Sequence, residues 1–158
     1  MQVLEQLQRL SPERFLAIYQ SLEQQGFGPL DNEVAKHLRF RPQAIRKLPF
    51  DQRARTARRI LEQSRNAQMA YEILGAYLIK NARTLVTDFL DATGVQHQDG
   101  MIEDLDNAKP DAGKIASAIQ MLDQKYKPED VTIYLAMCAE QWPSVGELDS
   151  AWRQRPAG

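Results

Sequence analysis

Apolar side chains recur every three to four positions along most of this chain. In one segment, Phe15, Ile18, Tyr19 and Leu22 lie at positions i, i+3, i+4 and i+7. That spacing places all four on one face of an α-helix, whereas a half-buried strand would alternate every second residue. Prolines and glycines interrupt the pattern and mark connections between helices. The sequence therefore predicts an all-α fold, a compact bundle of about six to eight helices.

The most apolar segment spans residues 66–93, and we expect it to form the central helix of the bundle. One apolar stripe runs from Tyr71 to Phe89, and a second stripe covers another side of the first half. Gly75 would cost this helix about 1 kcal/mol relative to alanine unless a neighbouring helix packs closely there. We expect such a close contact at Gly75, and we expect Gly94 to end the helix.

Proline and side chains that cap helices mark where the other helices begin. Serine, threonine, aspartate and asparagine accept a hydrogen bond from a free amide of the first turn, and proline fits the first helical position. In the helix after Asp51 the alanines and isoleucine face the core, while Arg55 and Arg59, flanked by Arg58, face outward. We expect helices to begin near Ser11–Pro12, Asp31 or Asn32, Pro42, Asp51, Asp111, Pro128 and the Ser144–Glu147 capping box.

The chain of 158 residues is long enough to bury one core, so we predict a single helical domain, 1–158. Residues 94–110 show no sustained period, contain two glycines and end in a proline. We call this segment the acidic loop. It is longer than most connections between helices, so an alternative division has two subdomains, 1–93 and 111–155, joined by it.

The cellular compartment can be inferred from what the sequence lacks. Cys138 is the single cysteine and cannot form a disulfide within the chain. The first residues have no long apolar run, and the uncharged stretch 131–139 falls short of the roughly 20 residues that span a bilayer. We therefore expect a cytoplasmic protein without a membrane span.

Charge is strongly segregated although the whole chain carries only −1. Residues 36–65 hold ten basic and two acidic side chains, a net charge of +8, and both flanking segments are acidic. We expect this basic segment to contact a partner. The candidate partner-binding residues are Arg39, Arg41, Arg46, Lys47, Arg55, Arg58 and Arg59.

Two kinds of partner suit the basic segment. The leading hypothesis is a non-catalytic protein-interaction module that contacts an acidic protein or another copy of itself. The alternative is nucleic-acid binding through the same face, against which the pI of about 6.1 counts, because dedicated binding domains are usually far more basic. A third interpretation is that these cations pair with the protein's own acidic side chains.

Catalytic and metal-binding motifs are mostly missing from the sequence. Two histidines and one cysteine do not form any common zinc motif, and we identify no cofactor, small-molecule substrate or catalytic residue. One alternative is a metal-dependent or acid–base enzyme that uses His97, Asp99, Glu103 and Asp104 of the acidic loop. Their spacing does not match a calcium-binding loop, so a solvated acidic turn is the simpler interpretation.

Overall fold

The computed structural model describes residues 2–24, 32, 47–64 and 67–155. In these ranges it contains eight α-helices, one short 3₁₀ helix and no β-strand, which confirms the predicted all-α bundle. None of these helices combines the length and apolar composition needed to cross a bilayer. In chain order they are α1 (Gln2–Arg9), α2 (Pro12–Gln24), α5 (Phe50–Ser64), α6 (Ala67–Asn81), α7 (Arg83–Thr93), η1 (Ala112–Lys114), α8 (Ile115–Lys125), α9 (Pro128–Gln141) and α10 (Gly146–Arg153).

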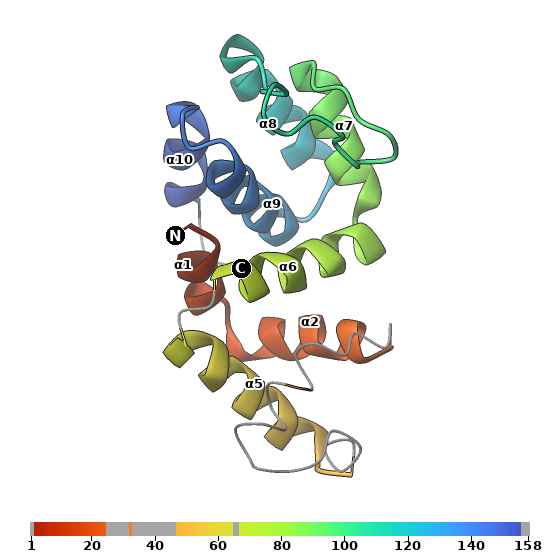
Figure 1. The fold of residues 1–158 in the computed structure, drawn as a ribbon, viewed down its shortest axis with the longest axis vertical. Coiled ribbons are helices and arrows are strands. Elements are labelled where there is room, and N and C mark those ends of the chain that lie inside the picture. The colour runs from red at the N-terminus through yellow and green to blue at the C-terminus, as the bar shows by residue number, and fades with distance from the viewer. Residues whose placement is uncertain (1, 25–31, 33–46, 65–66, 156–158) are drawn as a thin grey trace.

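Helix α9 is the most deeply buried element. Every residue from Asp130 to Ala139 is buried, so this helix has no solvent-facing side along that stretch. A helix that is apolar all round must be covered all round, and α1, α6, α8 and α10 pack against it (Figure 1). The core of the bundle is therefore built around α9.

The segment 66–93 forms two helices, so the expectation of one continuous central helix is wrong. Helix α6 ends at Asn81 and α7 begins at Arg83, with Ala82 between them at φ −147° and ψ 41°. The Asn81 side-chain amide donates to the carbonyl oxygen of Tyr77 at 2.9 Å and to Ser21 Oγ at 2.8 Å. A short polar side chain that bonds the backbone in this way competes with the regular helical pattern.

Both glycine predictions in this segment are confirmed. A Cβ atom on Gly75 would lie 3.3 Å from Cε of Met137, so α6 and α9 approach closely at this point. Gly94 has φ 77° and follows the last turn of α7 in the left-handed conformation that glycine adopts without strain.

The helix starts expected near Pro12, Asp51, Asp111, Pro128 and Glu147 are confirmed, but one of the expected caps is wrong. Ser11 Oγ accepts from the Arg14 amide at 3.1 Å, and Asp111 Oδ1 accepts from the Gly113 amide at 3.0 Å. The Ser144 cap is wrong, because Val145 holds the cap position of α10 and its amide donates to the Trp142 carbonyl at 3.0 Å. The two short helices expected between residues 31 and 48 lie almost entirely outside the described residues.

The first helix is tied to the last two. The Val3 amide donates to Glu140 Oε2 at 3.3 Å, and Arg153 pairs with Glu5 at 2.6 Å. Trp152 is fully buried nearby, and the guanidinium of Arg9 lies 5.2 Å from its ring. These contacts join the two ends of the described chain, while the division into subdomains at the acidic loop stays a prediction.

A polar cluster joins α2, α6 and α9. Asp130 accepts hydrogen bonds from the Arg14 guanidinium and from the Tyr77 hydroxyl, the latter at 3.1 Å, and Arg14 also donates to the Tyr77 oxygen at 2.8 Å. Burial, reinforced by the Asp130 charge, raises the pKa of Tyr77 to about 12. The phenol therefore stays protonated and keeps donating to Asp130 at neutral pH.

Gln6 of α1 is fully buried, yet no described residue bonds to its side-chain oxygen or nitrogen. A buried polar group without a partner costs about 1–3 kcal/mol. Gln6→Met keeps a similar length and removes both polar atoms, so we expect the free energy of unfolding to rise by about 1–2 kcal/mol in urea titrations.

The matched control for this experiment is Gln8→Met on the exposed face of the same helix. We expect it to change stability by less than about 0.5 kcal/mol. A loss of stability in Gln6→Met would show that the amide has a bonding partner in solution.

Candidate functional site

Four of the seven predicted partner-binding residues fall within the described part of the chain. Lys47, Arg55 and Arg59 are exposed, as expected for a contact surface, and Arg58 is half-buried. The side chains of Arg55 and Arg59 form no hydrogen bond or ion pair with any described residue. Arg39, Arg41 and Arg46 lie outside the described residues.

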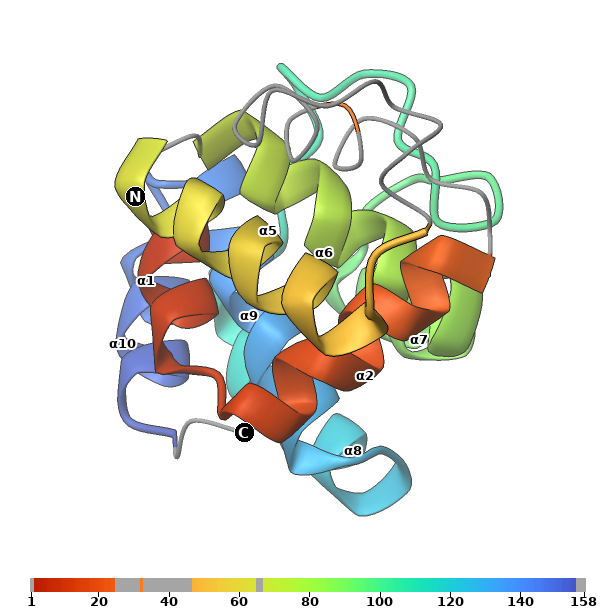
Figure 2. The ribbon, with the colours of Figure 1, turned by 90° about the horizontal axis from the view of Figure 1, so that it is seen from below.

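A groove runs between α2 and α5, which lie side by side in Figure 2. Its volume is about 530 Å³. Buried Phe15 and Ala54 lie at its base, and exposed Arg55 and Arg59 lie along one edge. We call it the basic groove; its lining is Pro12, Phe15, Leu16, Asp51, Ala54, Arg55, Arg58, Arg59 and Glu62.

Helical spacing explains why arginines line an apolar floor. On α5, Ala54 and Ala57 face the protein, while Arg55 and Arg59, four residues apart, share the outward face. On α2, Phe15 belongs to the predicted buried stripe, and Leu16, one position on, is only partly covered. Sequence reasoning assigned this α2 surface to the core and missed its contribution to a groove, because periodicity does not show which neighbour leaves a gap.

Arg58 has a structural role in the groove. Its guanidinium pairs with Glu62 at 2.9 Å, donates to the carbonyl oxygen of Leu10 at 2.7 Å, and lies 5.6 Å from the centre of the Phe15 ring. The Leu10 carbonyl belongs to the turn between α1 and α2, so Arg58 fixes α5 against that turn. It therefore does not project freely toward solvent as the sequence analysis expected.

Arg53 supports the interpretation that part of the basic segment is neutralised internally. This buried side chain pairs with Glu23 of α2, and its Nη2 atom lies 2.6 and 2.7 Å from the two carboxylate oxygens. Hydrogen bonds between two charged groups are roughly twice as strong as those between neutral groups. Among the described arginines of α5, Arg53 and Arg58 hold the helix in place, and Arg55 and Arg59 are left for contact with solvent or a partner.

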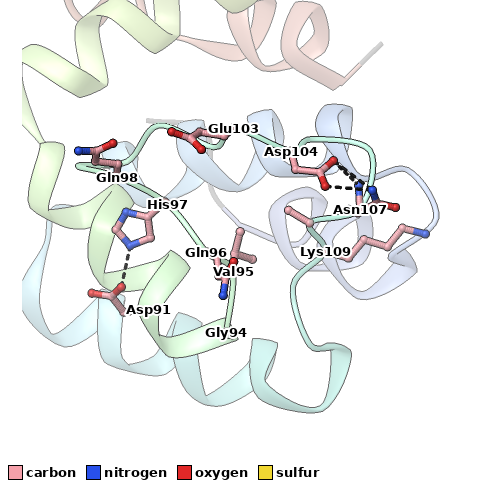
Figure 3. A pocket seen from close by; sticks show the side chains of 11 residues that line it. Asp91, Gly94, Val95, Gln96, His97, Gln98, Glu103, Asp104, Asn107 and Lys109 are labelled. Atoms are coloured by element: carbon pink, nitrogen blue, oxygen red, sulfur yellow. Dashed lines mark hydrogen bonds and ion pairs between the residues drawn. The ribbon is translucent and has the colours of Figure 1, made fainter.

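The acidic loop encloses a second, wider hollow of about 990 Å³ (Figure 3). His97 lies on its wall, and Nε2 of His97 lies 2.6 Å from Oδ1 of Asp91. The Gly100 amide donates to Nδ1 of His97 at 3.0 Å. Because Nδ1 accepts, Nε2 carries the proton and donates to Asp91, so both ring nitrogens are engaged in holding the loop.

Two of the loop carboxylates, Glu103 and Asp104, do not converge on His97. Figure 3 shows Glu103 and Asp104 across the hollow from the histidine, and Asp104 bonds to Asn107 at 3.0 Å. Within the described ranges, no group of three or more histidine, cysteine or acidic side chains is arranged to hold a metal ion. The partner of His97 is Asp91 of α7, which sequence reasoning did not include among the four candidate residues.

Cys138 is buried in α9, as expected of a small core side chain. Burial raises the pKa of its thiol to about 12. The thiolate is the nucleophilic form of cysteine, so at neutral pH this side chain is a neutral thiol packed in the interior.

The chain was compared with protein-family models, with curated proteins and with solved structures, and none of them matches it.

Substitution of single arginines separates the structural cations from the exposed ones. We expect Arg58→Met to lower the free energy of unfolding by about 1–3 kcal/mol, because the Leu10 carbonyl and Glu62 lose their hydrogen-bond donor. Arg59→Met, one residue away on the exposed face, should change it by less than about 0.5 kcal/mol. Chemical denaturation measures both variants, and equal effects would contradict the division of roles.

Proposed function

We propose that this protein is a non-catalytic interaction module that binds an acidic, amphipathic segment of a protein partner in the basic groove. The observation that carries the proposal is the combination of an apolar base, Phe15 and Ala54, with two exposed arginines at its edge. An amphipathic helix places its apolar face in such a groove and its polar residues at the rim.

Carboxylates on the partner are favoured by the chemistry of the rim. Arg55 and Arg59 lie four residues apart on α5 and project from the same face. A guanidinium offers several donors in a planar fork that matches a carboxylate, and complementary charge accelerates encounter and excludes basic competitors. Asp51 and Glu62, which come before and after these arginines along α5, also line the groove and would orient the partner by repelling its acidic side chains.

Nucleic-acid binding by the same face stays a prediction, and the groove favours a protein partner over it. The exposed cations Lys47, Arg55 and Arg59 could meet phosphates. However, Arg53 and Arg58 already bond to Glu23, Glu62 and backbone carbonyls, so fewer cations are available than the sequence implies. An apolar floor also has no role in contacting a phosphate backbone.

The acid–base enzyme hypothesis at the acidic loop has less support. His97 uses both ring nitrogens within the protein, and Glu103 and Asp104 lie across the hollow from it (Figure 3). We infer a reducing compartment such as the cytoplasm from the single, buried Cys138.

The test uses a synthetic peptide that forms an amphipathic helix with leucine on one face and glutamate on the other. We expect Arg55→Glu/Arg59→Glu to raise its dissociation constant at least about tenfold, because like charges would then meet at the rim. Fluorescence anisotropy with a labelled peptide gives the constants.

The matched control is Lys80→Glu/Lys114→Glu, which makes the same change in net charge at exposed sites outside the groove. It should bind the acidic peptide as the unaltered protein does. Equal affinity for a lysine version of the peptide, or tight binding to a DNA duplex in place of the peptide, would contradict the proposal.

A further inference from the structure

The acidic loop carries surface features that complement those of the basic groove. Met101 and Leu105 are the exposed large hydrophobic residues of the described chain, with 68% and 46% of their surfaces accessible. Four acidic residues lie among and beside them, and all four are exposed. These residues are Asp99, Glu103, Asp104 and Asp106.

The loop carboxylates are available to an outside cation. Among the described residues, Asp99, Glu103 and Asp106 form no ion pair, and Asp104 bonds only to Asn107. The proposed function requires a partner with an apolar side chain for the base of the groove and carboxylates for Arg55 and Arg59. The loop has both, since its exposed apolar side chains lie beside acidic groups that are available for pairing.

The turn that presents Met101 is preorganised. Gln98 and Met101 exchange two backbone hydrogen bonds of 2.8 and 2.9 Å, and Asp99 and Gly100 have φ values of 52° and 88°. His97 and Asp91 hold the base of the turn through the Gly100 amide. A loop already fixed in one conformation loses little entropy when it binds.

The loop and the groove lie toward different ends of the molecule. In Figure 1, α5 is at the lower end of the long axis and the acidic loop is at the upper right, and Figure 2 also shows them apart. A loop held in this position cannot enter the groove of its own chain, but it can enter the groove of another copy.

We propose that the acidic loop of one copy docks in the basic groove of a second copy. Met101 and Leu105 contact the apolar base formed by Phe15 and Ala54 and the adjacent Leu16, and the loop carboxylates face Arg55 and Arg59. This inference rests on the proposed function and names its occupant. Because a pair formed in this way keeps one groove and one loop free, on different copies, the contact is head-to-tail and propagates into chains or closed rings.

The experiment measures molar mass by sedimentation velocity over a series of protein and salt concentrations. The full chain should form dimers and larger species as its concentration rises. Added salt should reverse this association, because it screens the attraction between the two arginines and the loop carboxylates. Two variants test the surfaces separately: Arg55→Glu/Arg59→Glu reverses the exposed charges of the groove, and Glu103→Gln/Asp106→Asn neutralises two carboxylates of the loop without creating a new attraction to the altered groove. Each should be monomeric at concentrations where the unaltered protein associates.

Mixing the two variants is the decisive step. One variant retains its loop and the other retains its groove, so the mixture should form a 1:1 dimer that does not grow further. A symmetric interface, or one elsewhere on the surface, does not predict this result. Met101→Ser should also weaken association by about tenfold, and because Met101 is mostly exposed this change leaves the core intact. The control Lys80→Glu/Lys114→Glu should associate normally.

A chain that stays monomeric at every concentration, or a mixture that stays monomeric while the unaltered protein associates, overturns the inference. Binding of the acidic peptide to the groove then decides the proposed function separately. If the peptide binds, the groove serves a different partner; if it does not bind, both proposals fail.

Discussion

The fold depends on one hydrophobic requirement, the burial of α9 on all of its sides. From Asp130 to Ala139 the helix has no exposed position, so other helices must surround it. Helices α1, α6, α8 and α10 do so, and α2 packs on α6 from the next layer. Helix α5 in turn packs on α2, so two helices, α6 and α2, separate it from α9. The outer face of α5 is therefore left in solvent.

Polar contacts then decide which charges hold the bundle together and which remain available. Asp130 anchors Arg14 and Tyr77 at the start of α9, and Glu23 and the Leu10 carbonyl engage Arg53 and Arg58. These arginines are partly or wholly buried, where an unpaired cation would be costly. Arg55 and Arg59 lack such partners among the described residues, so the net charge of residues 36–65 overstates the charge that a partner meets.

The sequence predicted the fold class and most helix boundaries because these follow from local periodicity and capping residues, as at Ser11 and Gly94. The sequence prediction failed where a single polar side chain or a contact distant in the sequence decides where a helix ends or which helix is central. The segment expected as one central helix is divided at Ala82, beside the Asn81 side chain that bonds the backbone, and the helix that is buried on all sides is α9. For the candidate site, spacing alone gave the outward position of Arg55 and Arg59. The groove beside them and the Asp91 partner of His97 depend on tertiary packing, which periodicity does not encode.

Native-state hydrogen exchange tests the central role of α9 most directly. If the bundle is built around this helix, the amides of residues 131–139 should exchange only through global unfolding, and their exchange free energies should equal the free energy of unfolding measured with denaturant. The amides of α5 should exchange through smaller openings, with lower free energies. Exchange free energies in α9 that are as low as those in α5 and below the free energy of unfolding would contradict the account, because they would mean that the bundle persists while its central helix opens.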